Sequence, residues 1–160
     1  MKQAYPVIVG DAANYDDYVR ALDGGVTHIY NSVGGVKMGA YTQTLLKAIA
    51  MTHAPIEHIG DISAGGIYNE FRSGIRPYLS AVRTLYPKYT RDQVHKLDWY
   101  RDSGLAFTIF RPGLIKDGSE TEIAPPTPDH HDIHEDEFDI NWSTFVRAAT
   151  NVLFNDDYHN

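Results

Sequence analysis

Short apolar runs alternate with longer segments of helical periodicity along most of the chain. The runs are rich in β-branched and aromatic residues, and most of them stop at glycine or proline, which is typical of buried strands that end in turns. Strands are predicted over residues 5–10, 27–33, 56–63 and 105–110, with a short one over 138–141 and room for another within 114–124.

Segments whose apolar side chains recur at helical spacing lie between these strands. Helices are predicted from a cap at Asn14 to the glycines at 24 and 25, over residues 38–53, over 91–102 with Thr90 as cap, and from a cap at Ser143 to residue 153 or 154. Strands that alternate with helices in this way favour a parallel sheet with crossover helices. The sequence therefore predicts an α/β fold with a mainly parallel sheet and helices on both faces.

Composition narrows the class of protein further. The chain has 160 residues, a formal net charge of -7 and no cysteine. The length suits one domain over residues 1–160, and the absence of cysteine excludes a disulfide framework and a thiol nucleophile. The acidic balance disfavours nucleic-acid binding. Because no apolar run approaches the roughly 20 residues of a membrane span, and none resembles a signal peptide, we expect a soluble cytoplasmic protein.

Four motifs follow the predicted strands in a recognisable order. They are Gly10 with Asp11, the glycine-rich segment 33–35, the sequence ISAGGIY at 62–68, and SGLAFTIFRPG at 103–113. Their order resembles the atypical short-chain dehydrogenase/reductase superfamily, in particular the NmrA-like regulators and the NAD(P)H-binding proteins related to flavin and biliverdin reductases. The resemblance covers about residues 7–153. It implies a Rossmann-like domain that binds NAD(P) and an NAD(P)H-dependent oxidoreductase whose acceptor is flavin- or quinone-like.

The resemblance implies which strand ends contact the adenosine half of the cofactor. Asp11, with Ala12 beside it, would accept a hydrogen bond from the adenine amino group. Val33, Gly34 and Gly35 would form the turn that packs on the adenine ribose. An aspartate after a strand can equally well cap the following turn, and paired glycines can be ordinary turn residues, so both interpretations stay open.

The nicotinamide half involves the later strand ends and the candidate catalytic residues, Ser63 and Tyr89. Ser63 matches the serine near the reacting carbonyl or nicotinamide, and Pro112 and Gly113 match the backbone that contacts the carboxamide. Enzymes of the family have a tyrosine four residues before a lysine, whose charge helps the phenol to transfer a proton. Tyr89 occupies the tyrosine position, but Gln93 stands where the lysine would be and carries no charge. Tyr89 is thus the only candidate acid, and Ser63 is more easily explained as a positioning hydroxyl.

The chain departs from the family most clearly at its beginning. The family opens with a strand and a glycine-rich turn whose amides bind the pyrophosphate, but no such turn precedes Val7. We therefore expect an N-terminally truncated Rossmann-like domain without the first βαβ unit. The strand over 7–9 would pair with 27–33, pair across a homodimer, or lie at a sheet edge. A non-catalytic nucleotide-sensing or partner-binding protein, and a truncated relic of an enzyme, remain alternatives.

Residues 125–137 form a proline-, histidine- and acid-rich stretch. His131 and His134 are three residues apart, so they could share a helical face and bind a metal together with nearby carboxylates. Zinc sites usually draw a further ligand from a rigid scaffold, whereas this stretch has prolines at positions 125, 126 and 128. We therefore predict a solvated acidic loop and no metal site.

Overall fold

The computed structural model describes residues 6–65, 67, 83–119 and 139–154. The described helices and strands are, in chain order, α1 (Tyr15–Leu22), β1 (His28–Asn31), α2 (Met38–Thr52), β2 (His58–Ile62), α4 (Pro87–Ser103), β3 (Phe107–Phe110), β4 (Leu114–Lys116), β5 (Asp139–Asn141) and α5 (Trp142–Phe154). None of these helices is long and apolar enough to cross a membrane.

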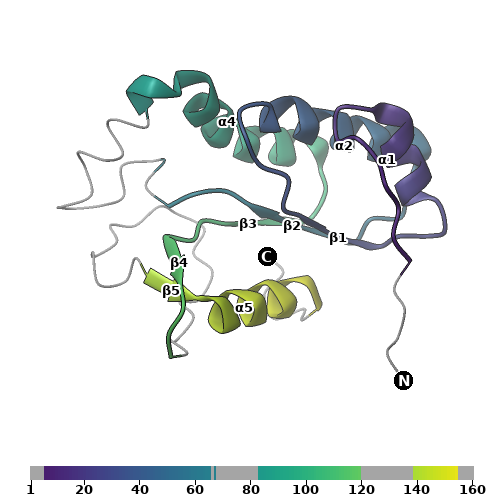
Figure 1. The fold of residues 1–160 in the computed structure, drawn as a ribbon. Helices are drawn as coiled ribbons and strands as arrows, with labels where there is room; N and C mark the ends of the chain where they lie inside the picture. The colour runs from purple at the N-terminus through teal and green to yellow at the C-terminus, as the bar shows by residue number, and fades with distance from the viewer. Residues whose placement is uncertain (1–5, 66, 68–82, 120–138, 155–160) are drawn as a thin grey trace.

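Three parallel strands form the centre of the fold, in the order β1-β2-β3. The register sets Asn31 beside Asp61, and Asp61 beside Ile109. Helices α1, α2 and α4 cover one face of this sheet and α5 covers the other (Figure 1). Strands β4 and β5 form a second parallel pair. The predicted α/β fold with a parallel sheet and helices on both faces is therefore confirmed.

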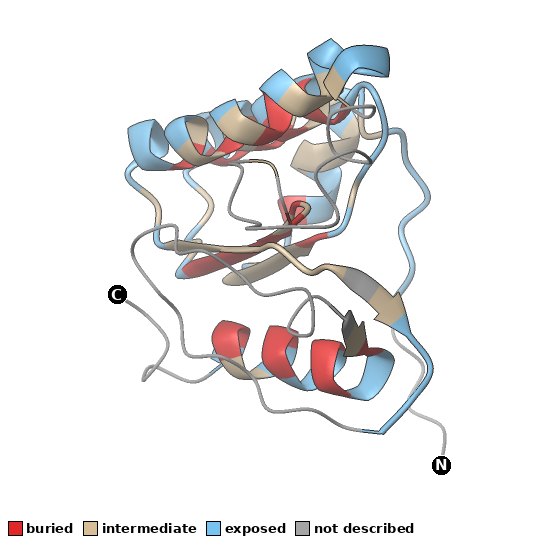
Figure 2. Ribbon diagram, turned by 90° about the vertical axis from the view of Figure 1, so that its left-hand side faces the viewer, coloured by how far each residue is buried: buried red, intermediate tan, exposed pale blue. Residues whose placement is uncertain are grey.

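The core lies on both faces of the sheet. On the face covered by α1, α2 and α4, the buried side chains belong to Leu22, Leu45, Ala48, Ile49, Ile59 and Tyr100. On the other face, α5 packs against β1 and β2, and buried residues recur along this helix (Figure 2). A Cβ at Gly60 would lie 3.3 Å from Leu153 and 3.2 Å from Phe110, so glycine at this position lets α5 approach the sheet closely. Each large apolar side chain buried here stabilises the fold by about 1.5–3 kcal/mol.

Most predicted elements are present, although two of the predicted helix starts are wrong. The side chain of Asn14 accepts a hydrogen bond from the Asp16 amide and caps α1, as predicted. Helix α4 begins at Pro87, one turn earlier than expected, because proline at the first helical position needs no backbone donor. The cap of α5 is Asn141, whose Oδ1 accepts from the Thr144 amide at 2.7 Å, and not Ser143.

The strand predicted over residues 5–10 is wrong for its described part, residues 6–10, which carry no strand. Val7 is 84% exposed and Val9 is 87% exposed. The carbonyl of Val9 accepts a hydrogen bond from the Arg20 guanidinium of α1 at 3.0 Å, so this part of the segment is bonded to a helix and not to a strand. Among the described residues, β1 has one strand neighbour, which is β2. The acidic stretch 125–137 lies outside the described residues.

Candidate functional site

The carboxyl ends of β2 and β3 stay paired beyond the strands themselves. The Ser63 amide donates to the Phe110 carbonyl at 2.7 Å, and the Gly65 amide donates to the Pro112 carbonyl at 2.9 Å. These two bonds set Ser63 beside the segment that leads to Pro112 and Gly113. The structure thus brings together three residues that the sequence assigned to the nicotinamide half of the site.

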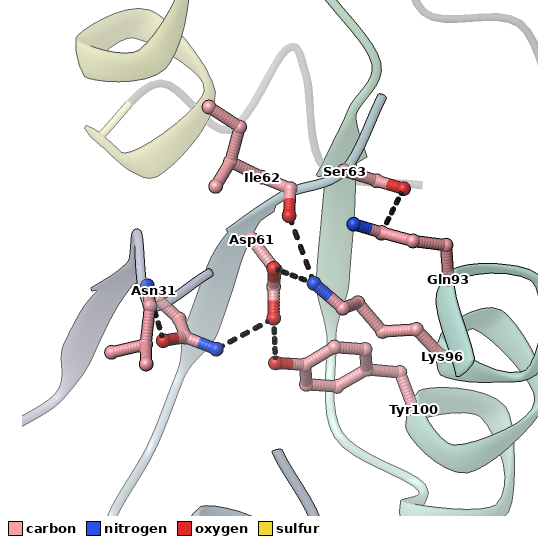
Figure 3. A network of polar contacts seen from close by, with 8 residues as sticks. Asn31, Asp61, Ile62, Ser63, Gln93, Lys96 and Tyr100 are labelled. Atoms are coloured by element: carbon pink, nitrogen blue, oxygen red, sulfur yellow. Dashed lines mark hydrogen bonds and ion pairs between the residues drawn. The ribbon is translucent and has the colours of Figure 1, made fainter. Parts of the chain in front are cut away.

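The Ser63 side chain is buried against α4. Its hydroxyl donates to Oε1 of Gln93 at 2.6 Å, and both residues are buried (Figure 3). Because the hydroxyl proton is directed to Gln93, the Ser63 oxygen is left with lone pairs that can accept a further hydrogen bond. Ser63 is therefore arranged as an acceptor toward any third group.

Tyr89 lies in the first turn of α4, one helical turn before Gln93, and is half-buried. Within the described part of the chain, no hydrogen bond joins Tyr89 to Ser63. Gln93, at the position predicted for the family lysine, is the α4 residue whose hydrogen bond with Ser63 the described part of the chain shows. The predicted catalytic role of Tyr89 stays a prediction.

The turn after β1 exposes its backbone. Apart from the neighbouring residues in the chain, no heavy atom of the described residues lies within 4 Å of the place that a Cβ would occupy at Gly34 or at Gly35, and Gly35 has a φ of 90°. The side chain of Asn31 accepts from the Val33 amide at 3.3 Å, and the Gly35 carbonyl accepts from the Met38 amide at the start of α2. A ligand can therefore approach the backbone of this turn closely, and the contact of residues 33–35 with the adenine ribose stays a prediction.

Asp11 closes the turn that leads into α1. Its carboxylate accepts from the Ala13 amide at 2.8 Å, and its own amide donates to Asp17 at 2.8 Å. That amide lowers the pKa of Asp17, and Arg20 lowers it further. Asp11 thus performs the turn-capping role that the sequence left open. Its role toward adenine, with half-buried Ala12 beside it, stays a prediction.

A buried ion pair lies just before Ser63 and was missed by the sequence reasoning. Asp61 on β2 and Lys96 on α4 are each 0% exposed, and Lys96 Nζ lies 2.6 Å from Asp61 Oδ1 (Figure 3). The same ammonium donates to the Ile62 carbonyl at 2.8 Å. The second carboxylate oxygen, Oδ2, accepts from Asn31 Nδ2 at 2.7 Å and from the Tyr100 hydroxyl. Asp61 therefore connects β1, β2 and α4.

Burial shifts the proton equilibria around this carboxylate. It lowers the pKa of Lys96, and the attraction of Asp61 opposes that change. It raises the pKa of Tyr100 far above its ordinary range, and the Asp61 charge adds to the rise. The pKa values of Tyr18 and Tyr30 are also raised, first by burial and then by Asp61. The sequence signal for this cluster was an aspartate inside an apolar strand, together with Lys96 and Tyr100 four residues apart on one helix face.

A family model described as NAD(P)H-binding matches residues 2–138. The chain belongs to this NAD(P)H-binding family. The family model confirms the predicted resemblance to NAD(P)H-binding proteins. No match to a curated protein is found.

Several solved structures share the fold. A short-chain dehydrogenase/reductase from Veillonella parvula DSM 2008 has a TM-score of 0.72 at 19% identity, over 94% of this chain and 65% of that one. A second structure with this description and from this source, in complex with NADP, has a TM-score of 0.67 at 18% identity, over 93% and 64%. ChuY, an anaerobillin reductase from Escherichia coli O157:H7, has a TM-score of 0.66 at 21% identity, over 92% and 68%. The chain thus spans slightly less than two thirds of the length of the first two structures.

Proposed function

We propose that this chain provides the nicotinamide-binding part of an NAD(P)H-dependent oxidoreductase with a flavin- or quinone-like acceptor. The supporting observation is the pairing that sets Ser63 beside Pro112 at the carboxyl ends of β2 and β3. Ligands of parallel α/β sheets bind at this edge, and the chain belongs to an NAD(P)H-binding family.

The described residues suit the nicotinamide end of a dinucleotide. The Ser63 oxygen, whose own proton is directed to Gln93, can accept a hydrogen bond from a carboxamide N–H. The backbone at Pro112 and Gly113 follows β3, beside the end of β2, and provides further polar groups. The exposed glycines at 34 and 35 leave room for a sugar or a base to lie against the backbone.

The side chains around Ser63 favour an acceptor that needs no protein acid. Gln93 carries no charge and holds the Ser63 proton, so Ser63 is not oriented to donate to a substrate. When bound, the cofactor would supply a hydride, which carries two electrons to the acceptor. A flavin or a quinone can take its remaining proton from water, and this property separates such acceptors from simple ketones.

A non-catalytic nucleotide-binding protein is the second candidate function. The observation that favours it is Gln93 at the lysine position, hydrogen-bonded to Ser63. Turnover distinguishes the two candidates. The proposed oxidoreductase should oxidise NADPH when a flavin or quinone is added, whereas a binding protein should bind NADPH without turnover. If Tyr89 acts as an acid, Gln93→Lys should in addition raise the rate at neutral pH, because the lysine charge is restored.

The proposed function is tested by titrating the chain with NADPH and NADH. Energy transfer from Trp99 or Trp142 to the reduced nicotinamide reports binding, and calorimetry provides an independent measure. We expect saturable binding in the micromolar range, about -8 kcal/mol. Loss of reduced-nicotinamide absorbance with added flavin or quinone then reports turnover. No binding at millimolar cofactor would contradict the proposal.

Replacement of Ser63 by alanine tests where the cofactor binds. One hydrogen bond contributes about 0.5–1.5 kcal/mol, so Ser63→Ala should weaken NADPH binding by up to about ten-fold. The matched control is Ser143→Ala on α5, where the serine is exposed. Equal affinities of the two variants would show that the cofactor does not contact Ser63.

A further inference from the structure

Two segments of the proposed site are tied to one buried carboxylate. Toward β1, Asp61 Oδ2 accepts from Asn31 Nδ2, and Oδ1 of the same Asn31 accepts from the Val33 amide. Toward α4, Asp61 Oδ1 accepts from Lys96, and the same ammonium donates to the Ile62 carbonyl, one residue before Ser63. A single side chain thus connects the turn after β1 with the backbone that leads to Ser63 (Figure 3).

We propose that Asp61 is a positioning residue of this site, which sets the turn at 33–35 relative to Ser63 through Asn31 and Lys96. The inference rests on the proposed function, since the two segments are those expected to contact the cofactor. Asp61 is fully buried and contacts no ligand itself. Its effect on cofactor binding is therefore indirect.

The orientation of the Asn31 amide is determined by its partners. A carboxylate accepts and a backbone N–H donates, so Nδ2 must face Asp61 and Oδ1 must face Val33. Rotation of the amide by half a turn would place its oxygen against the Asp61 carboxylate and its NH₂ group against the Val33 N–H. The Asp61 carboxylate thereby selects the amide orientation in which the Val33 backbone is held.

Stability alone does not account for this arrangement. Removing two opposite charges from water costs free energy that their attraction repays only in part, so well-packed apolar residues often stabilise a fold equally well. Here the ion pair lies at the end of β2 that leads to Ser63. Its hydrogen bonds lead to the Ile62 carbonyl, to the Val33 amide through Asn31, and to Tyr100 on α4. What the pair adds is a defined position for these groups.

The test compares two asparagine-to-alanine variants. Asn31 and Asn141 are similarly buried, at 6% and 5% exposure, and each Oδ1 accepts from a backbone amide two or three residues further along. Asn141 caps α5 and has no contact with Asp61 among the described residues. Asn31→Ala should weaken NADPH binding about ten-fold and make the Val33 amide exchange with solvent at least about ten times faster. Asn141→Ala should change neither quantity by more than about two-fold.

A third variant, Asn31→Ser, separates the hydrogen bond to the Val33 amide from the hydrogen bond to Asp61. A serine hydroxyl can still accept from the amide two residues on, but it is too short to reach Asp61. If Asp61 positions the turn, Asn31→Ser should behave like Asn31→Ala. Recovery of Val33 protection and of NADPH affinity in Asn31→Ser would overturn the proposal, because the turn would then hold its position without Asp61.

Two further results have clear meanings. If the unaltered chain binds neither NADPH nor NADH, the proposed function fails, and exchange at Val33 still decides whether Asp61 positions the turn. If Asn31→Ala and Asn141→Ala lose equal stability while Val33 exchange and NADPH affinity stay at the values of the unaltered chain, the network is only structural and the inference is wrong. Should Asn31→Ala not fold, the comparison of Asn31→Ser with Asn141→Ala decides the question by the same readouts.

Discussion

Removal of the charge on Lys96 should destabilise the protein strongly. Lys96 and Asp61 are both 0% exposed and their charged atoms lie 2.6 Å apart. The substitution Lys96→Met leaves the Asp61 carboxylate buried without its counter-ion, and breaking such a pair on one side costs about 3–5 kcal/mol. This is a large part of the roughly 5–15 kcal/mol by which a domain is stable.

The neutral double variant, Asp61→Asn with Lys96→Met, should be much less destabilised than the sum of its two single changes. The asparagine oxygen still accepts from Asn31 and Tyr100, and what remains lost is the bond to the Ile62 carbonyl together with one unpaired amide. That loss amounts to about 1–3 kcal/mol. The two substitutions should therefore show a coupling of several kcal/mol.

Urea unfolding at neutral pH measures these differences. With a slope of about 2 kcal/mol per molar urea, Lys96→Met should move the midpoint down by about 1.5–2.5 M, and the double variant should recover most of that shift. If the free-energy losses of the two single variants simply add in the double variant, the pair is not coupled in the folded state. The account of the Asp61 network would then be refuted.

Two other predictions concern Tyr100 and Gly39. The folded-state pKa of Tyr100 is raised, so its stabilising effect is complete below pH 10 and is lost as the pH rises further. Between pH 10 and 12, the unfolding free energy should therefore fall less steeply with pH in Tyr100→Phe than in the unaltered chain. The two slopes should differ by about 1.4 kcal/mol per pH unit. Equal slopes, measured by denaturant unfolding at each pH, would contradict this. A Cβ at Gly39 on α2 would lie 2.5 Å from a carboxylate oxygen of Asp92 on α4, so Gly39→Ala should lower stability by about 1–3 kcal/mol. Gly118→Ala should not, because a Cβ there meets no atom of the described residues within 4 Å. Thermal unfolding of the two alanine variants checks this difference, and equal melting temperatures would show that the helices separate without cost.

Local pattern was enough to predict most of the elements. The alternation of apolar runs with helical periodicity led to β1, β2, β3, α1 and α2. The helices bury one face whose spacing is visible in the sequence, and the strands, which are covered on both faces, are short apolar runs. The same rule failed at residues 7–9. An apolar run has the same sequence pattern whether or not a strand lies beside it. Whether it has a partner strand depends on residues far away in the chain.

Some contacts of the candidate site could be predicted from the sequence, and others could not. Ser63 and Pro112 could be assigned to one edge because parallel strands end at the same side of a sheet, and the structure confirms that they are neighbours. The contact of Ser63 with Gln93 and that of Asp61 with Lys96 could not be predicted. Each joins residues 30 or more positions apart, and only the packing of α4 on β2 decides which side chains meet.

The central claim is that a nicotinamide dinucleotide binds at the carboxyl ends of β1, β2 and β3. Heteronuclear NMR of the chain during a titration with NADPH tests it most directly, because each amide reports its own surroundings. The amide signals of Gly34, Ser63 and Gly113 should shift together and saturate with one dissociation constant, while Gly24 and Gly104, which follow α1 and α4, should not move. Shifts at Gly24 and Gly104 with none at Ser63, or no shift at all at millimolar NADPH, would contradict the account.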